Sequence, residues 1–211
     1  MHTEKKEWLT SLMKVTSIPS EDIPNIDLYM DQITTFMDAH LSDSRRYPED
    51  KIMTKTMINN YTKNHLLPPS VKKKYSREHI FLLIMIYRLK NVLSITDIQS
   101  LLEPLTTEYF SAQGKDEITL KNIYDQLLTR VKQKDSQIEQ TILHSWEKTR
   151  DSFSEHDLPA PQAEALDDFL FLYELCYDIY VRKQLIEKII DYHREQHVSS
   201  DKKTKKKGTA L

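Results

Sequence analysis

An uninterrupted run of eight apolar and aromatic residues, Ile80 to Tyr87, limits the folds open to this chain. Ser76 can cap a helix over 77–91, and Glu78 falls in its first turn, where the helix dipole favours an acid. The run therefore lies in a helix that is apolar on every side. Such a helix is stable only when other elements surround it, so the sequence predicts a central, buried helix with neighbours all round.

The neighbouring elements are also predicted to be helices. Only two glycines occur in the chain, and its many Lys, Glu, Leu and Ile residues favour helix over sheet. Apolar residues at helical spacing predict further helices over 4–16, 28–41, 55–66, 117–150 and 162–196, and another that begins at Ser94 or Thr96. The longest stripe is expected to pack through Ile123, Leu127, Val131, Ile138, Ile142 and Trp146. The predicted fold class is all-α.

Composition argues against several classes of function. Two glycines cannot build the glycine-rich loops that hold nucleotide phosphates. Cys176 has no disulfide partner in the chain and is expected to be a small core residue. No arrangement of side chains points to catalysis, so no enzyme, metal site or cofactor is predicted. No apolar run follows Lys5 and Lys6, and no segment is long enough to span a bilayer, so we expect a cytoplasmic protein with no membrane partner.

Charge is divided unevenly along the chain, although the net charge is only −2. Between Lys51 and Lys90, nine Lys or Arg and one acid give +8, whereas residues 151–180 contain eight acids and no Lys or Arg. A basic region of this kind indicates an anionic partner. A nearly neutral total does not exclude nucleic acid when the positive charge is clustered.

The segment 53–75 is the candidate contact surface. Thr54 is the predicted N-cap of the helix over 55–66, whose outer face carries amide and basic side chains that can bond base edges in the major groove. A lysine triplet in the following loop suits phosphate, which positions a protein on DNA without specifying sequence. The predicted DNA-binding residues are Thr54, Lys55, Thr56, Asn59, Asn60, Tyr61, Lys63, Lys72, Lys73, Lys74, Tyr75 and Arg77. The alternative for these residues as a group is a polar helix face that is simply solvated. The two tyrosines can instead pack their rings in the core and keep the hydroxyl in contact with water.

The order of these elements resembles the winged helix-turn-helix of MerR-type regulators. The sequence Leu66-Leu67-Pro68-Pro69 is similar to the exit of that family's recognition helix. Residues 75–80 resemble the return of its wing into the third helix, and residues 95–102 resemble its fourth helix. This resemblance implies a basic wing beside a helix that enters the major groove of double-stranded DNA.

The span 26–102 also resembles an uncharacterised bacterial family, a domain of unknown function. Three stretches carry this resemblance: IDLYMDQ at 26–32, TKTMINNY at 54–61 and KKYSREH at 73–79.

These patterns predict an N-terminal segment over 1–25, a MerR-like DNA-binding domain over 26–106, a helical domain for dimerisation or effector sensing over 116–197 and a disordered basic tail over 198–211. Residues 169–181 are apolar nearly all round, so neighbours or a second subunit should bury them. Our hypothesis is a sequence-specific bacterial transcriptional regulator that binds DNA as a homodimer, and a small-molecule effector is left open. The alternative is a protein-interaction adaptor that reuses a helix-turn-helix fold.

Overall fold

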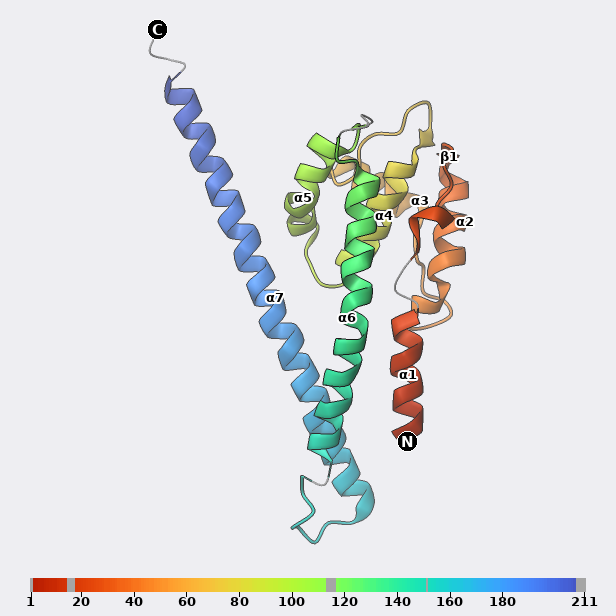
Figure 1. Cartoon of the computed structure of the whole chain (residues 1–211), viewed down its shortest axis with the longest axis vertical. Coiled ribbons are helices and arrows are strands. Elements are labelled where there is room, and N and C mark those ends of the chain that lie inside the picture. The colour runs from red at the N-terminus through yellow and green to blue at the C-terminus, as the bar shows by residue number, and fades with distance from the viewer. Residues whose placement is uncertain (1, 15–17, 113–116, 151, 208–211) are drawn as a thin grey trace.

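The computed structural model of the chain describes residues 2–14, 18–112, 117–150 and 152–207. The all-α prediction is confirmed for these residues, because helices make up the fold and its two strands are only two residues long each. Figure 1 shows two long helices beside a compact group of shorter ones. The helices are α1 (His2–Lys14), α2 (Met30–Leu41), α3 (Lys55–Lys63), α4 (Arg77–Leu89), α5 (Ile95–Pro104), α6 (Leu120–Thr149) and α7 (Ala160–Lys207). Three short helical turns, at Ser20–Asp22, Ser42–Ser44 and Leu105–Tyr109, connect them.

Helix α4 is the buried centre that the apolar run predicts. Every residue from Ile80 to Tyr87 is buried, and six of the eight have no exposed surface at all. A capping box at Ser76 starts the helix, with the His79 ring as its return partner. At about 25 cal/mol per Å² of apolar surface removed from water, this helix contributes heavily to the stability of the fold.

The core extends beyond residues 26–106 on both sides. It takes Ile18 and Ile23 from the segment before β1 (Leu28–Tyr29), Leu120, Tyr124 and Leu128 from the first half of α6, and Ile190 from α7. The Tyr124 hydroxyl donates a hydrogen bond of 2.8 Å to the Ile18 carbonyl. Burial raises the pKa of that hydroxyl to about 12, so it stays protonated and keeps donating. One core therefore joins the N-terminal segment to α6.

The predicted packing stripe of α6 is partly wrong. Leu127 and Ile138 are exposed, and the side chains that enter the core lie one position along, at Leu120, Tyr124 and Leu128. The reason is tertiary: the Phe81 ring of α4 packs against Tyr124 with 4.6 Å between ring centroids. Trp146, at the other end of α6, is buried as predicted.

A small sheet replaces the start of the predicted helix over 28–41. β1 pairs antiparallel with β2 (Lys74–Tyr75), which places Leu28 opposite Tyr75 and Tyr29 opposite Lys74. The backbone of residues 28 and 29 bonds to this partner strand, so α2 begins two residues later than predicted. The pairing ties the loop before α4 to the entry of α2.

Helix α7 differs most from the prediction. It runs from Ala160 to Lys207, longer than the predicted helix over 162–196, and 208–211 lie outside the described residues. Extending an existing helix costs far less than nucleating one. The disordered basic tail over 198–211 stays a prediction. Cys176, expected in the core, is exposed. Within the described part of the chain, no helix is both apolar enough and long enough to cross a membrane.

Candidate nucleic-acid interface

The outer face of α3 presents the polar side chains that the sequence predicts. Thr56, Asn59, Asn60 and Lys63 are all exposed, while Ile58 on the opposite face has no exposed surface. This inward anchor fixes the rotation of α3 about its axis. The four outward residues therefore form one continuous polar face.

The two ends of α3 are fixed by local hydrogen bonds. Thr54 is its N-cap, and the threonine hydroxyl accepts a bond of 3.1 Å from the Met57 backbone N–H. At the C-terminal end, His65 adopts a φ of 55°, and the Leu66 N–H bonds to the Tyr61 carbonyl at 2.9 Å. This left-handed cap ends the helix at Lys63, three residues earlier than predicted. Since the Thr54 hydroxyl already accepts the cap bond, Thr54 serves to position the helix.

The lysine triplet forms a two-residue hairpin. The Val71 N–H donates to the Lys74 carbonyl at 3.0 Å, and the Lys74 N–H donates back at 2.9 Å. Lys72 and Lys73 at the tip have φ values of 51° and 63°. Positive φ at both central residues defines a type I′ turn, which normally selects Asn-Gly. Two lysines hold this conformation at a cost of about 1–2 kcal/mol each, and both side chains are exposed.

Tyr61 and Tyr75 are core residues, which fits the packing alternative that the sequence leaves open for both. Their exposed fractions are 6% and 4%, and burial raises the pKa of the Tyr61 hydroxyl. Tyr75 lies in β2 and packs edge-on against His79, with 5.3 Å between ring centroids. Tyr61 lies three residues after the buried Ile58 and therefore shares its inward side, whereas no periodicity in the sequence indicates whether Tyr75 in β2 is buried.

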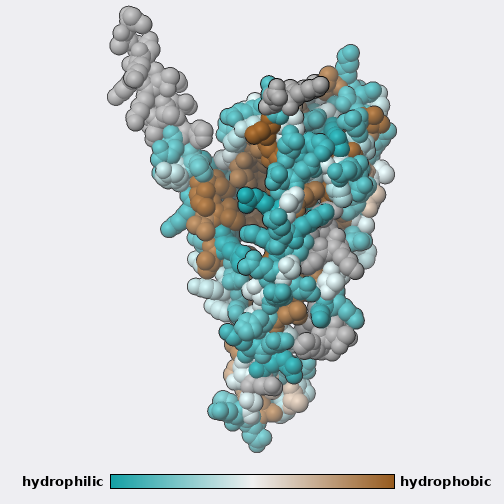
Figure 2. Space-filling model, in the orientation of Figure 1, coloured by the Kyte–Doolittle hydropathy of each residue, from teal (hydrophilic) through white to brown (hydrophobic). Residues whose placement is uncertain are grey.

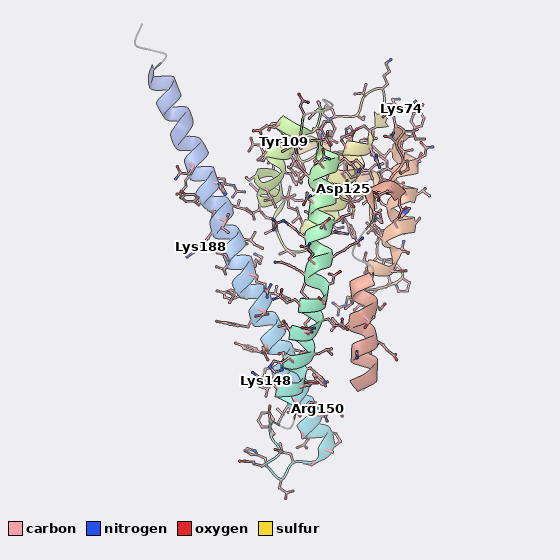
Figure 3. The ribbon with its side chains drawn as sticks, in the orientation of Figure 1. Lys74, Tyr109, Asp125, Lys148, Arg150 and Lys188 are labelled. Carbon is pink, nitrogen blue, oxygen red and sulfur yellow. The ribbon has the colours of Figure 1, made fainter. Side chains whose placement is uncertain are left out.

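Three of the predicted basic contacts are engaged within the molecule. Lys55 forms an ion pair with Asp31 of α2, although both side chains are mostly exposed. The Lys74 ammonium lies 5.3 Å from the centre of the Tyr29 ring, and Figure 3 labels it beside β1 and α2.

Arg77 is turned furthest inward. Its guanidinium donates to the Ser20 carbonyl and lies 5.6 Å from the centre of the Phe81 ring. These contacts make Arg77 a link between α4 and the N-terminal segment, and its contact with phosphate stays a prediction.

His79 is a buried residue that joins the start of α4 to Tyr75 of β2, and the sequence prediction missed it. Its Nδ1 accepts a bond of 2.9 Å from the Ser76 backbone N–H, and its ring packs edge-on against Phe110. Burial lowers the pKa of the imidazole, so the neutral ring is favoured. The spacing of Ser76 and His79 resembles a capping box, but His rather than Glu or Gln at that position hides the signal.

Less of the basic region faces solvent than the charge count suggests. Lys51, Lys55, Lys63, Lys72 and Lys73 are exposed, whereas the other four cations between 51 and 90 are partly covered. Burial lowers the pKa of Arg88 and of Lys90. The positive surface is therefore concentrated at α3 and the hairpin tip.

Comparison with known proteins identifies a family, but no individual curated protein and no solved structure that is similar. A search of curated proteins and a search of solved structures found no match. A family model described as a domain of unknown function, DUF1836, matches residues 18–127. The matched span contains most of the buried core, whose residues run from Ile18 to Leu128 and include Ile190 of α7. The chain therefore belongs to the DUF1836 family.

Proposed function

We propose that the chain is a DNA-binding regulator in which α3 reads base edges and the hairpin tip contacts phosphate. The observation that carries the proposal is the pairing of an exposed amide and basic helix face with a strained, lysine-tipped hairpin on the same part of the fold. The resemblance to MerR-type regulators, with their recognition helix followed by a basic wing, supports the same proposal.

The chemistry of the α3 face suits the major groove. An asparagine amide can bond bidentately to adenine, and a lysine can reach guanine acceptors. Asn59, Asn60 and Lys63 supply these groups from an element of nine residues, about 13 Å long at 1.5 Å per residue. An α-helix with its side chains is about 10–12 Å in diameter, which fits a major groove about 12 Å wide.

The hairpin tip suits phosphate. Lys72 and Lys73 are consecutive, and both side chains are exposed. It is their neighbour Lys74 whose ammonium lies over the Tyr29 ring. Local strain that is retained in a structure clusters at functional sites. Here the two residues with strained backbone angles, Lys72 and Lys73, are the ones whose ammonium groups are exposed to solvent.

A titration with double-stranded DNA tests the proposal. A pool of random duplexes is incubated with the protein, the bound fraction is sequenced, and affinity for the selected duplex is measured from low to high salt. We expect affinity to fall steeply with salt, because each phosphate contact releases condensed counterions. No binding at any salt concentration, or affinity that does not change with salt, refutes the proposal.

One double variant tests base reading, and a second double variant is its control. Asn59→Ala with Asn60→Ala should change which duplexes are selected, since amide contacts specify bases. The matched control is Lys132→Ala with Lys134→Ala, two exposed lysines of α6 away from the proposed surface. If the protein instead captures a protein from nuclease-treated lysate and binds no duplex, the adaptor function replaces the regulator.

A further inference from the structure

Helix α7 is held at two places and bare between them. Near its N-terminal end, the ring of Phe171 packs against Trp146 of α6 with 5.0 Å between centroids. Near the other end, the Arg194 guanidinium bonds to Asp97 at 2.9 Å and to the Thr96 carbonyl at 2.8 Å. Every residue from 176 to 182 is exposed. The middle of the helix therefore has no covering neighbour within the described chain.

A continuous stripe runs along the side of α7 that faces away from the core. Ile190 and Ile186 lie on the side of α7 that packs on the core. At 100° per residue, Val181 in the middle of the bare segment lies on the opposite side of the helix. Glu174, Tyr177, Val181, Leu185 and Lys188 follow at helical spacings of three and four on this outer side. Tyr177 and Leu185 are each 59% exposed and Val181 is 46% exposed, which is unusual for large apolar side chains.

Figure 2 shows hydrophobic side chains exposed on part of α7. Figure 3 shows Lys188 on the side of α7 turned away from α5 and α6. The stripe spans about 21 Å at 1.5 Å per residue.

The chemistry of the stripe is symmetric about Val181. Tyr177 and Leu185 lie four residues to either side of it, and Glu174 and Lys188 lie seven residues to either side. If a second copy of the helix ran antiparallel, each tyrosine would face a leucine and each glutamate would face a lysine. An interface between identical chains related by a two-fold axis requires this kind of self-complementarity.

The charge of the whole helix changes sign at the same point. Residues 160–181 contain five acids and no Lys or Arg, which gives −5, whereas residues 182–207 contain nine Lys or Arg and four acids, which gives +5. An antiparallel pair places each acidic half beside a basic half. A parallel pair would place like charges side by side, which is unfavourable.

We propose that α7 binds α7 of a second copy of this chain in antiparallel orientation, with the two-fold axis at Val181. The apolar centre of the stripe buries against its counterpart, and two ion pairs between Glu174 and Lys188, one on each side of the axis, set the register. This interface forms the dimer in which the proposed regulator binds DNA. The proposed function explains what the dimer is for, but the evidence for the interface does not depend on it. The test of the interface uses protein without DNA, so its failure and the failure of DNA binding are distinguishable.

Charge reversal tests the register. In sedimentation of the full chain, Glu174→Lys alone or Lys188→Glu alone should weaken dimerisation roughly tenfold, since each creates two like-charged contacts per dimer. The double variant, Glu174→Lys with Lys188→Glu, should restore it. Lys132→Glu, a charge reversal at an exposed residue of α6, is the control and should leave the dimer close to the parent.

Cysteine pairing tests the orientation. In a Cys176→Ser background, Tyr177→Cys protein is mixed with Leu185→Cys protein under mild oxidation. The antiparallel arrangement predicts that mixed disulfide dimers form and that neither protein alone cross-links efficiently. Efficient cross-linking of each protein with itself indicates a parallel pair and overturns the proposal. A parent chain that is monomeric at all concentrations, or a double charge variant that stays as weak as the single ones, also overturns it.

Discussion

Replacing Lys72-Lys73 by Asn-Gly should make the protein more stable and, at the same time, weaken its binding to DNA. Both lysines have positive φ at the tip of a type I′ turn. Asn and Gly are the residues that this turn prefers, so the substitution keeps the hairpin and removes two charges. The two effects have opposite signs, which few substitutions at a binding surface produce.

The gain in stability follows from the backbone angles. A residue with a β-carbon in the left-handed region costs about 1–2 kcal/mol, and most of that cost is relieved by glycine and part of it by asparagine. The added freedom of glycine in the unfolded chain offsets about 0.4–1 kcal/mol. The net gain is therefore about 1–2 kcal/mol. For a chain of this size it corresponds to a rise in melting temperature of roughly 2–8 °C.

The assay combines thermal or urea unfolding with the salt titration of DNA binding. Each lysine that contacts a phosphate adds about 0.9 to the slope of log affinity against log salt. If both lysines make such contacts, the slope of the Asn-Gly variant should be shallower than that of the parent by about 2. Affinity should fall for all duplexes alike, because phosphate contacts carry no sequence information.

A second variant separates strain from charge. Lys72→Ala with Lys73→Ala removes the same two charges and keeps a β-carbon at each strained position, so it should lose DNA affinity without gaining stability. An Asn-Gly variant that is no more stable than the parent refutes the argument from strain. An Asn-Gly variant that keeps its affinity and salt slope refutes the phosphate contact.

Two further predictions concern the core. Because burial lowers the pKa of His79 below its unfolded value of 6.5, the unfolded chain binds the proton more readily, and stability should fall as the pH drops from about 6.5 toward the lowered folded pKa. The free energy of unfolding changes by at most about 1.4 kcal/mol per pH unit through this group. The variant His79→Gln keeps an acceptor for the Ser76 N–H but does not titrate. It should therefore remove this acid-sensitive component from urea unfolding curves measured at several pH values. If His79→Gln and the parent lose stability equally on acidification, another group is responsible. Tyr124→Phe removes the bond to the Ile18 carbonyl and should cost about 1–3 kcal/mol in the free energy of unfolding, since a buried acceptor is left without its donor. A loss too small to measure would mean that water replaces the hydroxyl there.

Local patterns predicted much of the fold and the exposed side of α3. The helical spacing around Ile58 predicted which side of α3 faces solvent, and the exposure of Asn59, Asn60 and Lys63 confirms it. The same spacing places Tyr61, three residues after Ile58, on the inward side, and Tyr61 is buried. The inward turn of Arg77 could not be predicted, because its partner, Ser20, is distant in sequence.

The sequence by itself determined that the chain is helical and that α4 is its centre. Glycine scarcity and eight consecutive apolar residues act through local backbone preference and burial, which need no knowledge of the partner. Only the tertiary structure decided which side of α6 enters the core, that Leu28 and Tyr29 form a strand, and that the middle of α7 is left bare. Each of these depends on contacts between segments far apart in the chain, and such contacts are fixed by how the helices pack together.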